Sequence, residues 1–245
     1  MVPFGPTGGD AVARPVVHAE RGAQHAVHAE RGAQHEQLPH VRPHRDHLVS
    51  FYEDGTYLAA SVRPFLLQGL DAGETVLVVA TEEHREAFAR ALVGSGHDLA
   101  ASRRAGRYRE LDAARTLARL APGGALTSDS FRAGLADAVT AMARTAAGFR
   151  AYGELSALLW QRGDLGLALE LEDRSNALLA TVAAPIFCGY PLAAFDTVET
   201  TARFHDVCAR HTLVTTDSYG ALSAVGSRAD GVVMLPADLP GGSPA

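Results

Sequence analysis

From residue 47 onward, short apolar runs alternate with longer segments in which apolar residues recur every three to four positions. The short runs predict six β-strands, at His47–Tyr52, Thr75–Ala80, Arg107–Leu111, Phe149–Tyr152, Ile186–Tyr190 and Thr212–Thr215. The run TVLVVA at Thr75–Ala80 is continuous and apolar, which is typical of a strand buried on both faces of a parallel sheet.

The longer segments predict helices. The first has an apolar face made by Leu58, Val62, Phe65, Leu66 and Leu70. Pro64 lies inside it, and we expect this proline to kink the helix or to begin its second half. Thr81 is the expected N-cap of the second helix, which Gly94 and Gly96 end. Four further helices are predicted: one from a cap near Asp129 or Ser130 through Met142, and others over Leu155–Gln161, Leu165–Ala184 and Glu199–Arg210.

This alternation favours βαβ units, because parallel strands need a crossover of a dozen or so residues between them. The predicted fold is α/β, a three-layer sandwich with a mostly parallel central sheet. Residues 1–46 are rich in Pro, Gly, His and Arg without any hydrophobic period, which predicts disorder. Within them the nonamer VHAERGAQH occurs twice. The expected organisation is a disordered segment at 1–46, one domain at 47–225 and a flexible tail at 226–245.

Composition excludes several classes of function. Lys and Arg together number 22 and all 22 are arginine, so a P-loop lysine cannot be placed. The formal net charge of −6 and a pI near 6.0 argue against direct nucleic-acid binding. The most apolar run, Ala177–Cys188, is interrupted by Pro185 and too short to span a membrane, and the start of the chain lacks a signal pattern. The sequence thus predicts a cytoplasmic protein with no membrane association.

Polar residues that follow strands or interrupt apolar stripes are the candidates for a binding site. Glu154 directly follows a strand and Gly153, where ligands of parallel sheets bind; the alternative is a glutamate that stabilises a helix N-terminus. Glu172 and Asn176 share an apolar helix face, where they either face a cavity or form a structural hydrogen-bonded pair. His47 and His84 adjoin strands, although a capping or exposed role is the simpler interpretation of His84.

Metal and hydrolase motifs are not evident. Seven of the eleven histidines lie in the first 47 residues, but their spacing defines no tetrahedral site. The two cysteines, Cys188 and Cys208, form no C-x-x-C pair, which favours reduced thiols over a disulfide or a zinc site. Neither G-x-S-x-G nor H-E-x-x-H is present. We therefore assign no metal site, no cofactor and no catalytic residue from the sequence.

Five segments taken in order resemble the MEDS family, the methanogen/methylotroph DcmR-type sensory domain, over roughly His44 to Thr216. The segments are HLVSFYED, PFLLQGLDAGETVLVVATEE, FRAYGELSALLW, ALELEDRSNALL and FCGYPLAAF. The residues that match the family pattern are His47, Phe51, Tyr52, Gly73, Glu74, Gly153, Glu154, Trp160, Glu172, Asn176, Cys188 and Tyr190. The resemblance implies a RecA/KaiC-like core that has lost its P-loop and senses small organic molecules.

The resemblance also implies a signalling partner, since family members occur alone or joined to histidine kinases, DNA-binding domains or anti-sigma modules. We expect a stand-alone sensor that binds a small organic ligand and signals to a kinase, an anti-sigma protein or a transcription factor. The predicted ligand-binding residues are His47, Tyr52, Glu154, Trp160, Glu172, Asn176 and Tyr190. Two alternatives stay open: an enzyme with Glu154 as general base, and a ligand-free scaffold in an anti-sigma-type network.

Overall fold

A computed structural model of the chain describes residues 46–216. The predictions for the His-rich segment, its repeated nonamer and the tail after residue 225 concern residues 1–45 and 217–245, which lie outside the described residues.

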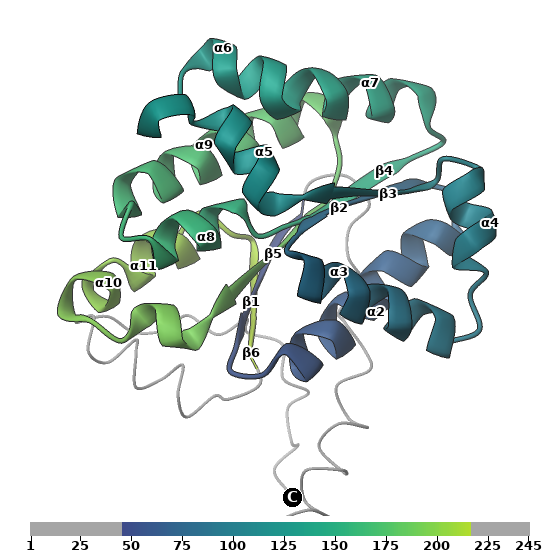
Figure 1. The fold of residues 1–245 in the computed structure, drawn as a ribbon, viewed down its shortest axis with the longest axis horizontal. Helices are drawn as coiled ribbons and strands as arrows, with labels where there is room; N and C mark the ends of the chain where they lie inside the picture. The colour runs from purple at the N-terminus through teal and green to yellow at the C-terminus, as the bar shows by residue number, and fades with distance from the viewer. Residues whose placement is uncertain (1–45, 217–245) are drawn as a thin grey trace, which may run out of the picture. The chain divides into compact units, whose positions relative to one another are not determined.

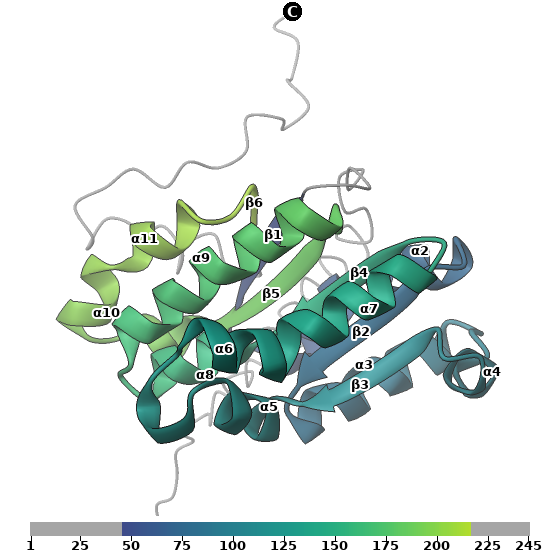
Figure 2. The same cartoon turned by 90° about the horizontal axis from the view of Figure 1, so that it is seen from above.

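A six-stranded sheet forms the centre of the described part, in the order β3-β2-β4-β5-β1-β6, and every pairing is parallel (Figure 1). Its strands are β1 (His47–Tyr52), β2 (Thr75–Ala80), β3 (Tyr108–Asp112), β4 (Phe149–Gly153), β5 (Ile186–Pro191) and β6 (Leu213–Thr216). Helices cover both faces of the sheet (Figure 2). The predicted α/β three-layer sandwich is confirmed.

The helices divide into two layers. One face of the sheet is covered by α2 (Gly55–Asp71), α3 (Glu82–Gly94) and α4 (Leu99–Arg104). The other is covered by α5 (Ala113–Leu120), α6 (Ser128–Phe131), α7 (Asp137–Thr145), α8 (Leu155–Gln161), α9 (Leu165–Val182), α10 (Val198–Ala202) and α11 (Phe204–Cys208). Two short 3₁₀ helices, Pro122–Gly124 and Leu192–Phe195, join elements of this second layer.

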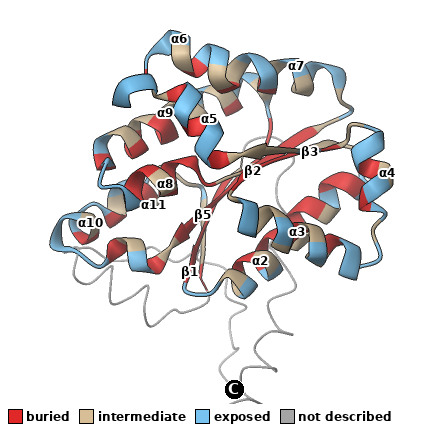
Figure 3. Ribbon diagram, in the orientation of Figure 1, coloured by how far each residue is buried: buried red, intermediate tan, exposed pale blue. Residues whose placement is uncertain are grey.

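Strand side chains alternate between the two layers. Leu48 packs with α2 and α3, whereas its neighbour Val49 packs with the α5–α9 layer; Tyr152 and Ala151 divide in the same way. The four inner strands β2, β4, β5 and β1 are consequently buried on both faces (Figure 3), as the apolar run of β2 predicted, whereas the edge strands β3 and β6 are only partly buried. Polar side chains inside these strands therefore need partners within the protein.

Arg150 of β4 is such a side chain and is only 3% exposed. Its Nε donates to Glu74 Oε2 at 2.6 Å, and its Nη1 donates to the Phe65 carbonyl at 2.6 Å and to Gln68 Oε1 at 3.0 Å. Gly69 of α2 leaves room for the arginine, because a Cβ there would lie 2.6 Å from Arg150 Cδ. This buried network of one ion pair and two hydrogen bonds connects α2 and the loop before β2 to strand β4.

Several predicted boundaries differ from the structure. The N-cap of α6 is Thr127, not Asp129 or Ser130, because its hydroxyl accepts from Ser130 N in a reciprocal capping box. The helical run that follows contains a π-helical stretch, Arg132–Ala136, before α7 begins. The predicted helix Glu199–Arg210 is two helices, α10 and α11, separated at Arg203.

Other differences concern short elements. The helices α4 and α5, of six and eight residues, were not predicted because so few residues display little periodicity. Strand β3 lies one residue later than the predicted strand Arg107–Leu111. Helix α2 continues through Pro64 as one element, so no new helix begins at this proline.

Candidate functional site

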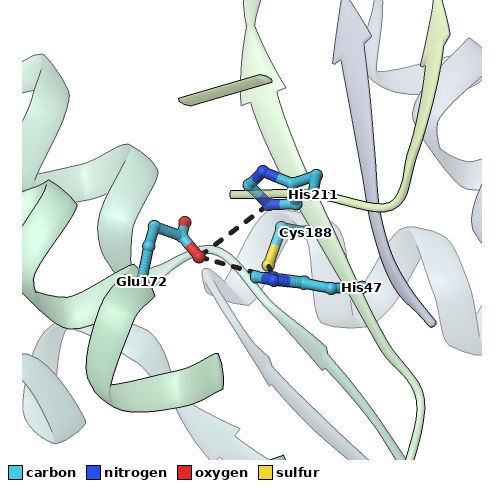
Figure 4. Close-up of side chains that lie close together, drawn as sticks. All are labelled: His47, Glu172, Cys188 and His211. Atoms are coloured by element: carbon cyan, nitrogen blue, oxygen red, sulfur yellow. Dashed lines mark hydrogen bonds and ion pairs between the residues drawn. The ribbon is translucent and has the colours of Figure 1, made fainter. Parts of the chain in front are cut away.

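Four side chains that could bind a metal meet on the α5–α9 side of the sheet, and we call them the quartet: His47, Glu172, Cys188 and His211. His47 is the first residue of β1, Cys188 lies within β5, Glu172 comes from α9, and His211 precedes β6. One donor atom from each residue lies within 4.8 Å of the donor atom of every other (Figure 4). Parallel pairing of β1 with both β5 and β6 brings these distant residues together.

The quartet has short internal distances. His47 Nε2 lies 3.2 Å from Cys188 Sγ and 3.4 Å from Glu172 Oε2. His211 Nε2 lies 3.8 Å from the same Glu172 oxygen, and the two imidazole rings have centroids 4.0 Å apart. All four side chains are shielded from solvent.

Outer hydrogen bonds hold three of these side chains. His47 Nδ1 lies 2.9 Å from Asn176 Oδ1 and 3.0 Å from the Arg210 carbonyl oxygen. His211 Nδ1 donates to the Val207 carbonyl at 2.7 Å, and the Tyr190 hydroxyl donates to Glu172 Oε1 at 2.8 Å. Both histidines therefore direct Nε2 into the quartet.

Burial is the main cause of the pKa shifts in and beside the quartet. Burial, reinforced by the neighbouring His47, lowers the pKa of His211 from 6.5 to about 4. Burial, followed by the charge of Glu172, raises the pKa of the Cys188 thiol and of the Tyr190 phenol. Near neutral pH, His211 is a neutral imidazole while Cys188 and Tyr190 carry their protons.

Glu154 forms a second polar cluster at the carboxyl edge of the sheet, directly after β4. Its carboxylate accepts from the backbone N–H of Thr81, from the Tyr152 hydroxyl at 3.2 Å, and from His84 Nδ1 at 2.6 Å. The side chain is 4% exposed. Although Glu154 occupies the N-cap position of α8, its carboxylate does not cap that helix. It instead joins β4 to the start of α3, where Thr81 is the N-cap as predicted.

We expect His84 to make stability depend on pH. Burial disfavours its charged form, but the hydrogen bond and the charge of Glu154 outweigh burial and raise its pKa above 6.5. A raised folded-state pKa stabilises the protein below pH 6.5, and this stabilisation is lost as pH rises through the folded-state value. His84→Gln should therefore cost about 1.5 kcal/mol at low pH and less in alkaline solution, in denaturant unfolding measured across this range.

The control for this pH effect is Thr145→Ala on α7, in the other helix layer, because threonine does not titrate. The difference in free energy of unfolding between wild type and this control should not become smaller as pH rises. A stability gap between wild type and His84→Gln that stayed constant or widened with pH would contradict the assigned pairing.

An apolar cavity lies between the sheet and α7–α9. Its walls include Leu135, Val139 and Leu179 from the helices and Ala151 from β4. The space inside it that the centres of water molecules can occupy is about 50 Å³. A single water needs roughly 10–15 Å³ on that measure, so the cavity has room for a few waters.

Comparison with family models gives a match to MEDS, the MEthanogen/methylotroph, DcmR Sensory domain, over residues 46–212. The match covers more than half of the chain and nearly all of the described part. The chain belongs to the MEDS family. MEDS is a family of sensory domains, which agrees with the sensory role expected from the sequence. A search of curated proteins found no match. Across residues 46–216 of this MEDS chain, no helix is both long and apolar enough to cross a membrane.

The seven predicted ligand-binding residues of the MEDS domain do not form one site. Glu154, Glu172 and Tyr190 line the cavity. His47 and Asn176 adjoin Glu172 but lie outside the cavity lining, at the amino end of β1. A single crevice at the carboxyl ends of the strands, as we expected, does not contain His47.

Tyr52 and Trp160 also lie outside the cavity lining. The ring of Tyr52 meets the edge of His84 with centroids 5.8 Å apart, beside Glu154. Trp160 packs 5.2 Å from Phe195 and donates Nε1–H to the Ala194 carbonyl at 3.0 Å. Trp160 borders a separate hollow near α10 and is 1% exposed, so its main role is in the core.

Two residues of the quartet were not among the predicted site residues. The sequence assigns Cys188 to the family pattern and favours a reduced thiol there over a zinc site, and nothing in the local sequence distinguishes His211. Only the position of His211 before the last predicted strand could have indicated it, together with knowledge that this strand pairs with β1.

Proposed function

We propose that this MEDS protein is a cytoplasmic sensor that binds a small organic molecule in the cavity between the sheet and α7–α9. The observation that carries the proposal is the composition of the cavity wall. The wall is mostly apolar, and a few residues with polar side chains interrupt it, among them Glu154, Glu172, Tyr190, Ser156 and Ser175. Sites for small molecules usually combine apolar walls with a few orienting polar groups.

The proposed ligand is a short aliphatic alcohol or amine. Its apolar part would contact Leu135, Val139 and Leu179, and its donor group would hydrogen-bond to Glu172. The Glu172 carboxylate disfavours a ligand that is itself a carboxylate, because two like charges in a buried site repel. The modest cavity volume favours a ligand of only a few non-hydrogen atoms.

The proposed output is a shift of α8 and α9, the two helices that follow Glu154. Both helices contribute residues to the cavity wall, Leu155 and Ala157 from α8 and Leu171 and Glu172 from α9. A ligand that fills the cavity favours one arrangement of these helices, and a kinase, anti-sigma protein or transcription factor reads the change.

We propose binding without turnover. The Glu154 carboxylate already accepts from the Thr81 N–H, the Tyr152 hydroxyl and His84, which leaves it poorly placed to take a proton from a ligand.

Methyl NMR tests this function. We expect 1-butanol and butylamine, but not butyrate, to shift the methyl resonances of Leu135, Val139 and Leu179, with an affinity of about 1 mM for so small a ligand. The ligand resonances themselves should persist unchanged after prolonged incubation. Absence of methyl shifts with every probe at millimolar concentrations would overturn ligand binding in this cavity.

A pair of matched variants locates the binding. Ala157→Val adds two methyl groups at the cavity wall on α8 and should abolish the shifts. Ala89→Val makes the same change on α3, against the opposite face of the sheet, and should leave them intact. Equal responses from the two variants would place the ligand elsewhere.

A further inference from the structure

The nitrogens that the two histidines of the quartet direct at their neighbours are lone-pair donors. A carbonyl oxygen can only accept, so His47 Nδ1 and His211 Nδ1, which face the carbonyls of Arg210 and Val207, carry the ring hydrogens. In the neutral rings, each Nε2 then presents a lone pair to the Glu172 carboxylate and the Cys188 sulfur.

His211 Nε2 has no hydrogen-bond partner, although its side chain is 0% exposed. Glu172 Oε2 lies 3.8 Å from this nitrogen and is itself an acceptor. A buried polar atom without a partner is costly, and this one points at three other electron-pair donors. A cation among the four donors would satisfy all of them at once.

We propose that His47, Glu172, Cys188 and His211 bind a divalent metal ion, with Zn²⁺ as the preferred ion, in a four-coordinate site. Metal–ligand bonds of about 2.0–2.3 Å place the donor atoms of a tetrahedron roughly 3.3–3.8 Å apart. Three of the six separations between donor atoms are 3.2 Å from His47 Nε2 to Cys188 Sγ, 3.4 Å from His47 Nε2 to Glu172 Oε2 and 3.8 Å from His211 Nε2 to Glu172 Oε2. All six stay within 4.8 Å, so a small inward movement of the side chains completes the tetrahedron.

The outer hydrogen bonds match what metal ligands require. Histidine ligands ordinarily donate their second ring N–H to a carbonyl or carboxylate, as His47 and His211 do here. The Tyr190 hydroxyl occupies Glu172 Oε1 and leaves Oε2 free to bind the ion. Asn176 further fixes the His47 ring, because its Nδ2 donates to the same Arg210 carbonyl that Nδ1 contacts.

Charge and ligand type favour Zn²⁺. When the ion binds, the Cys188 thiol releases its proton to solvent and a Zn–S bond forms, without any change of oxidation state. The thiolate and the Glu172 carboxylate then balance the two positive charges, so the site is neutral and suited to a buried position. Thiolate and imidazole in tetrahedral geometry select Zn²⁺ over Mg²⁺ or Ca²⁺, which prefer oxygen ligands.

The test uses Co²⁺ as a coloured substitute for Zn²⁺ in the full-length protein, with no organic ligand present, so its outcome is independent of the proposed ligand binding. We expect one equivalent of Co²⁺ to give intense visible bands of tetrahedral cobalt and a thiolate-to-cobalt charge-transfer band, and Zn²⁺ to abolish both. The histidines before residue 47 cannot produce the charge-transfer band, because both cysteines of the chain lie after residue 180.

Matched variants assign the ligands. Cys188→Ser should eliminate the charge-transfer band, whereas Cys208→Ser should retain it, since Cys208 is not part of the quartet. His211→Gln should lose tetrahedral cobalt, whereas His205→Gln should keep it. A wild-type protein without the charge-transfer band, or a band that survives Cys188→Ser, would overturn the proposal.

X-ray absorption of the zinc-loaded wild-type protein provides a result that does not depend on variants folding. We expect one sulfur at about 2.3 Å and three nitrogen or oxygen ligands at about 2.0–2.1 Å. A first shell made only of nitrogen and oxygen would overturn the proposal.

Discussion

Replacing Arg150 with alanine should lower the free energy of unfolding by about 3–5 kcal/mol, the cost of breaking a buried ion pair by removing one partner. The loss is large because the guanidinium satisfies Glu74, the Phe65 carbonyl and Gln68 together, and because alanine would leave a void beside Gly69. Denaturant unfolding followed by circular dichroism measures it.

Arg90→Ala is the matched control for this prediction. Arg90 forms an ion pair with Glu86 one helical turn away, and both side chains are more than half exposed. Such a pair contributes about 0.3–0.5 kcal/mol. If Arg150→Ala cost no more than Arg90→Ala, the buried network would not have the stabilising role assigned to it.

Replacing Glu154 with alanine should destabilise the protein by about 3 kcal/mol, because a buried N–H and a buried hydroxyl lose their acceptor. Thr81 and Tyr152 supply these donors, and His84 loses its counter-charge. Glu154→Gln keeps one acceptor oxygen and should lose less. Thermal or denaturant unfolding should rank the three proteins by stability as wild type, then Glu154→Gln, then Glu154→Ala.

The control for Glu154 is Glu199→Ala, in the exposed first turn of α10. Its carboxylate lies in the first turn of this helix, where the helix dipole stabilises a negative charge by about 0.3–1 kcal/mol. A Glu154→Ala variant as stable as Glu199→Ala would show that the bonds at the carboxyl edge contribute little.

Much of the fold was predictable because the inner strands of the sheet, which are buried on both faces, appear in the sequence as short apolar runs. All six strands of the described part were located to within a residue or so, and their separation by helices indicated a parallel sheet. The π-helical stretch at Arg132–Ala136 was not predictable, because apolar residues such as Phe131 and Leu135 keep an ordinary helical spacing. Nor was the break at Arg203, where nothing in the sequence stops a helix.

The candidate site was predictable only in part. Glu172 and Asn176 could be recognised because polar residues on an apolar helix face must have partners. Their partners could not be identified, because this required the strand order, which places β1 between β5 and β6. The rule that parallel sheets bind ligands at their carboxyl ends led to Glu154 and away from the amino end of β1, where His47 meets His211.

The contact between His47 and His211 joins β1, the first strand of the described part, to the turn that precedes β6, its last strand. On the ribosome, His47 emerges early, but it can meet its partner only after residue 211 has been synthesised. The quartet is therefore among the last features that can form during biosynthesis. A nascent or truncated chain that ends before residue 211 cannot assemble it, so occupancy of the quartet would distinguish finished domains from incomplete ones.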